Sequence, residues 1–182
     1  MNEITKLGLK LLLITSVAAF ILGITNDVTQ VIIQERALAE TKEALVALLP
    51  DADDFNVIED GEVLDRDLVL EAYEGVKNDE VVGYTVRVNP QGYGGAVEML
   101  IGVSADGSIT GIKIGTHSET PGLGSKIADA SFIDQFIDQT VEEDFAISQN
   151  VEAISGATIS STAVVKGVNA VGNLFQEVLS NR

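Results

Sequence analysis

The chain begins with an almost uninterrupted apolar stretch, Leu7–Thr25, in which Lys10 is the one charged residue. As a helix, the uncharged segment Leu11–Asn26 spans about 24 Å, compared with roughly 30 Å for the hydrocarbon core of a bilayer. The apolar residues before Lys10 close most of this difference, because its ammonium group can reach the headgroups. The alternative is a cleavable signal peptide, but no small-x-small cleavage site directly follows Gly23. We therefore predict an uncleaved single-pass membrane anchor over residues 1–26.

The charges on either side of this stretch predict its orientation. Lys6, Lys10 and the α-amino group precede it, whereas Asp27 follows it directly. Positive charges next to a membrane helix favour the cytoplasmic side. We therefore expect the N-terminus in the cytoplasm, a single pass through the cell (inner) membrane, and the rest of the chain on the extracytoplasmic side.

A helical period continues over residues 27–50. Apolar residues recur mostly at three- and four-residue spacing among glutamates and glutamines, and Pro50 with Asp51 ends the pattern. This predicts an amphipathic stalk helix, whose apolar face packs either on partner helices or on the chain's own domain. The apolar positions are Val31, Ile32, Ala37, Leu38, Leu45, Leu48 and Leu49.

The pattern then changes to short apolar runs that are typical of strands. Ala105-Asp106-Gly107, between the last two runs, indicates a hairpin. The runs are Val57-Ile58, Leu68–Tyr73, Val81–Val88, Ala96–Val103 and Ser108–Ile114.

Two further helices are expected, Ile127–Thr140 and Ser160–Leu179, each with a stripe of apolar residues at helical spacing. No long linker or internal repeat divides this part of the chain. Residues 51–182 therefore predict one α+β domain, an antiparallel sheet with flanking helices.

Composition narrows the functions that this domain can have. The chain carries 28 Asp and Glu against 11 Lys and Arg, so nucleic acid is an unfavourable partner. There is no cysteine and only one histidine, His117. Thiolate chemistry, disulfides, iron–sulfur ligation and multi-histidine metal sites are therefore excluded, and we predict no metal site.

The segment Ser155-Gly156-Ala157-Thr158 directly precedes the last helical pattern. The free N–H groups of a helix start, together with the helix dipole, form a site for an anion such as phosphate. Gly156 and Ala157 allow close approach to the backbone, and Thr158 adds a hydroxyl. The alternative is an ordinary stabilising helix cap.

A second motif lies upstream, His117-Ser118-Glu119-Thr120-Pro121-Gly122-Leu123-Gly124-Ser125-Lys126. Proline fixes φ and the two glycines permit backbone shapes that are closed to other residues. The motif predicts a stiff loop that could lie against a flat ring. The segment Gly92-Tyr93-Gly94-Gly95 predicts a flexible link between strands.

Together these segments resemble the G subunit of Rnf-type complexes, which are ferredoxin–NAD oxidoreductases, and also the related C subunit of the sodium-pumping NADH–quinone reductase. The resemblance covers the anchor, the glycine-rich link, the 117–126 loop and the Thr158 motif, in the same order. It implies an FMN-binding domain in which FMN is joined through its phosphate to Thr158.

The resemblance also implies the residues around this cofactor. The phosphate would be surrounded by Ser155, Gly156, Ala157, Ile159, Ser160 and Ser161. The ring would be bracketed by Glu119, Thr120, Leu123, Gly124 and Lys126, with Tyr93 in contact. Lys126 has the alternative of a solvated lysine. His117 is also assigned to the site, as a loop-stabilising residue rather than a catalyst, and no catalytic residue is expected because the flavin carries the chemistry.

In this family a flavin transferase makes the bond with FAD as donor, and its target pattern has an acid three residues before the serine. Here Glu152 stands where aspartate is usual. The resemblance thus implies an electron-transfer subunit with covalent FMN, partnered by other membrane and redox subunits of an ion-translocating oxidoreductase complex. The chain alone would not complete the reaction, since no strand–GxGxxG–helix fingerprint for a dinucleotide is present. The alternatives are a structural or assembly subunit, or an FMN module that feeds a separate reductase.

Overall fold

The computed structural model describes residues 6–13, 15–17, 19–20, 22 and 41–181. It divides into two units, Met1–Lys42 and Glu43–Arg182. In the first unit, all described residues up to position 22 are helical. Within the described residues, no helix is both long enough and apolar enough to cross a membrane. Much of the predicted anchor (1–26) and most of the stalk (27–50) lie outside the described residues, so both stay predictions, as does the boundary of the third segment, 51–182.

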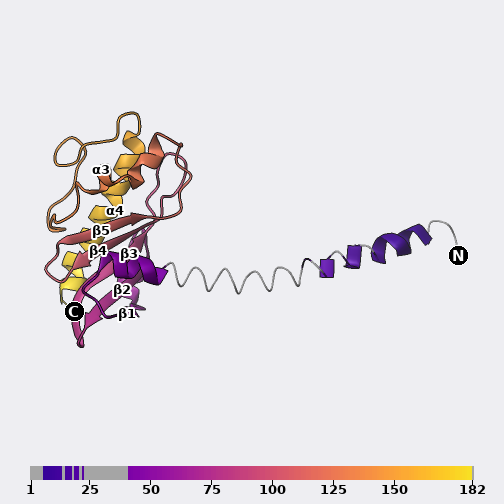
Figure 1. The fold of residues 1–182 in the computed structure, drawn as a ribbon, viewed down its shortest axis with the longest axis horizontal. Helices are drawn as coiled ribbons and strands as arrows, with labels where there is room; N and C mark the ends of the chain where they lie inside the picture. The colour runs from indigo at the N-terminus through magenta and orange to yellow at the C-terminus, as the bar shows by residue number, and fades with distance from the viewer. Residues whose placement is uncertain (1–5, 14, 18, 21, 23–40, 182) are drawn as a thin grey trace. The chain divides into compact units, whose positions relative to one another are not determined.

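The second unit is built on a five-stranded antiparallel sheet in which the strands lie in chain order (Figure 1). The prediction of an α+β domain with an antiparallel sheet is confirmed, and each predicted run contributes to a strand. The hairpin before β5 turns at Gly107, whose φ of 85° favours glycine. The strands are β1 (Asp54–Val57), β2 (Val69–Lys77), β3 (Glu80–Val88), β4 (Met99–Ser104) and β5 (Ile109–Ile114).

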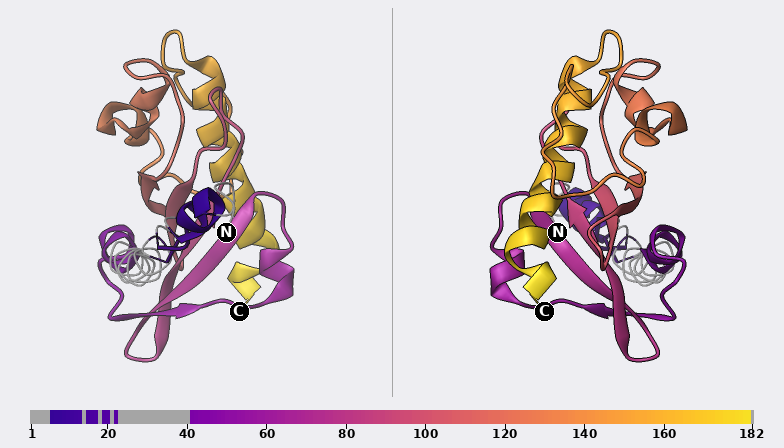
Figure 2. Two further views of the ribbon diagram at one scale, coloured as in Figure 1. Left: turned by 90° about the vertical axis from the view of Figure 1, so that its right-hand side faces the viewer. Right: turned by 90° about the vertical axis from the view of Figure 1, so that its left-hand side faces the viewer.

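The long helix α4 (Thr158–Glu177) covers one face of this sheet (Figure 2). Its apolar stripe is buried as predicted. The helix ends at Glu177, two residues before the predicted end at Leu179. The stripe belongs to the same buried core cluster as side chains of β3, β4 and β5, such as Val86, Met99 and Ile109, which are fully buried. The buried stripe consists of Val164, Val165, Val168, Val171, Leu174 and Phe175.

The opposite face of the sheet receives the helical residues 43–48 and Leu49. A methyl group added to Gly111 would lie 2.7 Å from Leu48 Cδ2, and one added to Gly83 would lie 2.8 Å from Leu49 Cδ2. These glycines therefore let the leucines approach the sheet backbone closely. Of the two partners considered for the stalk, its described end packs on the chain's own domain.

The predicted helix Ile127–Thr140 is wrong. A short 3-10 helix, η1 (Gly124–Ala128), is followed by a single turn, α3 (Ala130–Ile133). The two are separated by Asp129, whose φ of −72° and ψ of 139° are extended. Ile127, Phe132 and Phe136 are nevertheless buried, so the apolar spacing reflects burial rather than a continuous helix. The remaining short elements are α2 (Gly61–Leu64) and η2 (Leu179–Asn181).

Candidate functional site

The segment before α4 forms a tight turn that leads directly into the helix. Gly156 has a φ of 78°, which favours glycine, and the Ala157 N–H donates to the Ile154 carbonyl at 2.9 Å. The Ser161 hydroxyl donates to the Ala157 carbonyl and accepts from the Ile154 N–H, both at 3.0 Å. Ser161 is fully buried, so it fixes the turn from inside the protein.

No described side chain caps the start of α4. The N-cap residue is Ala157, which has no side-chain oxygen, and α4 begins at Thr158, two residues before the predicted start. An ordinary stabilising cap would place a serine, threonine, aspartate or asparagine oxygen on the first N–H groups. Those N–H groups and the positive end of a 20-residue helix therefore remain available to an anion.

The 117–126 loop is held by its own hydrogen bonds. The Thr120 carbonyl accepts from the Leu123 N–H at 3.2 Å and from the Ser125 N–H at 3.1 Å, and the Gly122 N–H donates to Ser125 Oγ at 2.9 Å. His117 Nδ1 accepts from the Glu119 N–H at 3.3 Å. This bond supports the interpretation of His117 as a loop-stabilising residue.

Glu119 connects this loop to two other segments. Its Oε1 accepts from the N–H groups of Tyr93 at 2.8 Å and Gly94 at 3.2 Å, and its Oε2 accepts from Ser160 Oγ at 2.6 Å. The residue is only 5 % exposed. Burial by itself raises the pKa of its carboxyl, but the hydrogen bonds from Ser160, Gly94 and Tyr93, with the nearby His117, hold the pKa below its ordinary value.

Three glycines make room for these contacts. A Cβ on Gly92 would collide with Glu119 Oε1, and a Cβ on Gly124 would collide with Glu119 Oε2 and lie 2.7 Å from Ser160 Oγ. A Cβ on Gly94 would collide with the Ser118 carbonyl oxygen. The sequence predicted a loop here, but it missed that Gly92 and Gly94 wrap the Glu119 carboxylate. The available signal was the cluster of Gly92, Gly94 and Gly95, upstream of a motif that contains a glutamate.

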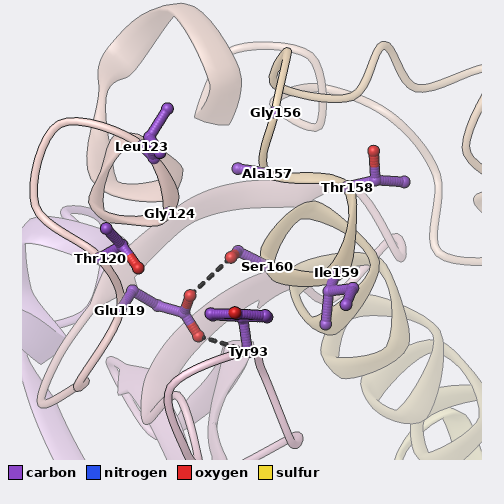
Figure 3. Close-up of a pocket in the computed structure, with 10 residues that line it drawn as sticks. All are labelled: Tyr93, Glu119, Thr120, Leu123, Gly124, Gly156, Ala157, Thr158, Ile159 and Ser160. Carbon is purple, nitrogen blue, oxygen red and sulfur yellow. Dashed lines mark hydrogen bonds between the residues drawn. The ribbon is translucent and has the colours of Figure 1, made fainter.

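The three segments line a cavity of about 570 Å³, named here the Thr158 cavity. Figure 3 shows the Glu119 carboxylate between Tyr93 and Ser160, with the Thr158 hydroxyl pointing away from this cluster. Ten of the predicted site residues line this cavity. They are Tyr93, Glu119, Thr120, Leu123, Gly124, Gly156, Ala157, Thr158, Ile159 and Ser160.

Four predicted site residues do not line the Thr158 cavity. His117 and Ser161 act within the turns described above. Ser155 and Lys126 are exposed, and neither side chain is among those that line the cavity. For Lys126 this placement favours the alternative of a solvated lysine.

The comparisons with known proteins agree with this geometry. Residues 92–172, which include all three segments, match the model of the FMN-binding domain family. A crystal structure of the C subunit of the Na⁺-translocating NADH-quinone reductase from Parabacteroides distasonis shares the fold. Its TM-score is 0.51 at 17% identity, and the match covers 69% of this chain and 77% of that one.

Two curated proteins are more similar in sequence. The G subunit of the Na⁺-translocating ferredoxin:NAD⁺ oxidoreductase complex of Acetobacterium woodii is 40% identical, over 95% of this chain and 92% of its own length. The G subunit of an ion-translocating oxidoreductase complex from Methanosarcina acetivorans is 41% identical, over 93% of each chain. The chain belongs to this family of G subunits.

Proposed function

We propose that this chain is an electron-transfer flavoprotein subunit of an ion-translocating ferredoxin:NAD⁺ oxidoreductase complex, with FMN bound covalently through its phosphate to Thr158. The observation that carries the proposal is the start of α4. There an exposed Thr158 and a helix N-terminus without a side-chain cap line the same cavity. This is the arrangement that a phosphate ester needs, because the helix start stabilises negative charge next to the hydroxyl that forms the bond.

The residues present fit FMN. A glycine-shaped backbone at Gly124 and Gly156 allows close approach to the cavity walls, and the volume falls within the roughly 300–1,000 Å³ of small-molecule sites. Three large side chains stand exposed around the cavity, Tyr93 at 69%, Leu123 at 46% and Ile159 at 55%. Exposed apolar surface of this kind favours an apolar ligand, and a flat aromatic ring would cover it.

When bound, FMN supplies the ability to accept and release electrons. The chain's own residues then have the tasks of holding and orienting it. The N-terminal end of α4 would bind the phosphate, the 117–126 loop and Tyr93 would place the ring, and the apolar side chains around the cavity would pack against it. None of these tasks requires a general acid or base, and the partner subunits complete the reaction with ferredoxin and NAD⁺.

The attachment requires a flavin transferase that uses FAD as the donor. In this reaction the Thr158 oxygen forms a bond to the phosphorus of the FMN half of FAD, and AMP leaves. Glu152 is well placed for recognition by such an enzyme. Its side chain is exposed, whereas its backbone is fixed by Gln135, which accepts from the Glu152 N–H at 2.7 Å and donates to its carbonyl at 3.2 Å.

The test is intact-mass analysis of the chain and of Thr158→Ala, both produced with the transferase. We expect a mass increment equal to attached FMN and a yellow colour, both lost in Thr158→Ala. Thr162→Ala is the matched control, since Thr162 lies one turn further along α4 and its hydroxyl donates to the Thr158 carbonyl. An unmodified chain in the presence of active transferase, or an increment that survives in Thr158→Ala, would contradict covalent attachment at this residue.

The apolar N-terminal stretch supports a single-pass anchor, and the positive charges before it favour an FMN domain on the extracytoplasmic side. The absence of cysteine makes this easy to test, because one introduced cysteine is unique. In intact cells a membrane-impermeant maleimide should label Ser131→Cys, an exposed site, but label Asn2→Cys only after lysis. The reverse labelling pattern would place the domain in the cytoplasm.

A further inference from the structure

We propose that Glu119 is a positioning residue for the flavin. Its carboxylate ties the Gly92–Gly95 loop to the first turn of α4, which fixes Tyr93 at the cavity, and its negative charge makes the bound flavin harder to reduce. The inference rests on the proposed function and assigns to Glu119 a role different from that of a ring-bracketing residue.

Glu119 joins the Gly92–Gly95 loop to α4 because both of its carboxylate oxygens accept hydrogen bonds from within the protein. Oε1 holds the backbone of Tyr93 and Gly94, and Oε2 holds Ser160, which lies 41 residues away in the sequence. Ser160 is 1% exposed. One side chain therefore joins three segments of the cavity wall, and its removal would leave the buried Ser160 hydroxyl and two part-buried N–H groups without this acceptor.

The packing leaves this carboxylate little freedom to turn away. Gly92 and Gly124 lie so close that even a methyl group on either would collide with one of the two carboxylate oxygens. Gly124 also lies against the Glu119 Cβ, at 3.1 Å from the position of an added methyl. The side chain is thus enclosed on both sides, and the Tyr93 backbone that it holds is fixed with it.

The negative charge of Glu119 is not neutralised by its hydrogen-bond donors, because all of these donors are neutral groups. The three donors are two backbone N–H groups and one hydroxyl, and the described ion pairs of the chain do not include Glu119. His117 and the positive end of α4 offset the charge only in part. A buried carboxylate at the cavity wall repels the negative charge that reduction adds to the ring, and the repulsion is strong where water is excluded.

The experiment compares Glu119→Gln with Ser160→Ala in the full chain produced with the transferase. Glutamine keeps an acceptor for the two N–H groups and can donate to Ser160 Oγ, so it removes the charge and keeps the tie. Ser160→Ala keeps the charge and removes one bond of the tie. Glu142→Gln, an exposed carboxylate that does not line the cavity, is the matched control.

We expect Glu119→Gln to retain attached FMN and an unchanged pattern of backbone hydrogen exchange, but to have a more positive reduction potential than the parent and Glu142→Gln. A potential that does not move, or that becomes more negative, overturns the charge role. A purely structural role of the Glu119 side chain would leave the reduction potential unchanged in this variant, because glutamine keeps the hydrogen bonds.

We expect Ser160→Ala to speed hydrogen exchange of the Tyr93 and Gly94 amides at least about fivefold, because a hydrogen bond that anchors their acceptor is lost. Unchanged exchange overturns the tie. This measurement applies equally to the chain without flavin. If intact mass shows that no FMN is attached to the parent, the proposed function fails, whereas the exchange result still decides the tie.

Discussion

Two cavities of nearly equal volume lie along α4, and they differ in the burial and charge of the residues that line them. The Thr158 cavity, of about 570 Å³, is formed by the N-terminal end of the helix. The other, of about 590 Å³ and named here the Arg66 cavity, is lined by residues from the later turns of α4 and by the segments 66–68 and 90–91. Volume alone therefore does not distinguish them.

The two cavities differ in the residues that line them. The Arg66 cavity is bordered by the ion pair Arg66–Glu177, with side chains 39% and 57% exposed, and by the exposed Lys166. These charged side chains are exposed to solvent. The Thr158 cavity has a buried carboxylate, an uncapped helix start and glycines that shape the backbone around both. A binding site is recognised here by preorganised backbone and buried charge, rather than by empty space.

The largest effect is expected from a change to this preorganised backbone, Gly94→Ala. Its methyl group would collide with the Ser118 carbonyl oxygen, which belongs to the backbone and cannot rotate away. We expect the free energy of unfolding to fall by about 1–3 kcal/mol, with a loss of attached FMN. Urea denaturation and intact mass measure the two effects.

Gly61→Ala is the control for this prediction. An added Cβ there meets only Asp65 Oδ2, at 3.7 Å, and alanine favours the helix that begins at this residue, by up to about 1 kcal/mol. It should leave FMN content unchanged and stability equal or higher. If Gly94→Ala behaves like Gly61→Ala, the glycine loop is not the rigid wall that distinguishes the two cavities.

A smaller effect is expected from pH. The pKa of the Glu119 carboxyl lies below its ordinary value in the folded chain, so its ionised form stabilises the fold. This contribution is complete above the unfolded pKa of about 4.3, and it is lost as the pH falls through the folded pKa. The melting temperature of the parent should therefore fall towards that of Glu119→Gln on acidification below about pH 4.3. A difference between the two that stays constant with pH would contradict the ionised, hydrogen-bonded state.

Much of the fold could be predicted from the sequence where a signal is local and long. The stripe of α4 repeats along the whole helix, and the strands are apolar runs bounded by turn residues. The 127–140 region misled the prediction because Ile127, Phe132 and Phe136 are buried and happen to keep helical spacing across a backbone that breaks at Asp129. The spacing of apolar residues shows which side chains are buried. It corresponds to a helix only where the helical backbone is continuous.

The candidate site was predictable as two motifs but not as one structure. Thr158 and the 117–126 loop are visible as short segments, and the structure brings ten of the predicted residues to one cavity. The bond between Glu119 and Ser160 joins positions 41 residues apart, and nothing in either motif specifies that pairing. The placement of Lys126 outside the cavity lining likewise depends on the turn of η1, which spacing alone does not define.

The smallest effect is expected in the Arg66 cavity. Arg66→Ala removes an ion pair with Glu177 whose partners are both substantially exposed, and exposed pairs contribute only about 0.2–1 kcal/mol. We expect a decrease in unfolding free energy within that range, smaller at high salt, and no change in FMN content or reduction potential. Because the pair links the segment before β2 to the last turn of α4, the effect should be confined to that end of the helix. A loss of FMN in Arg66→Ala would show that the two cavities are coupled through α4. The lining residues alone would then not account for the difference between the cavities.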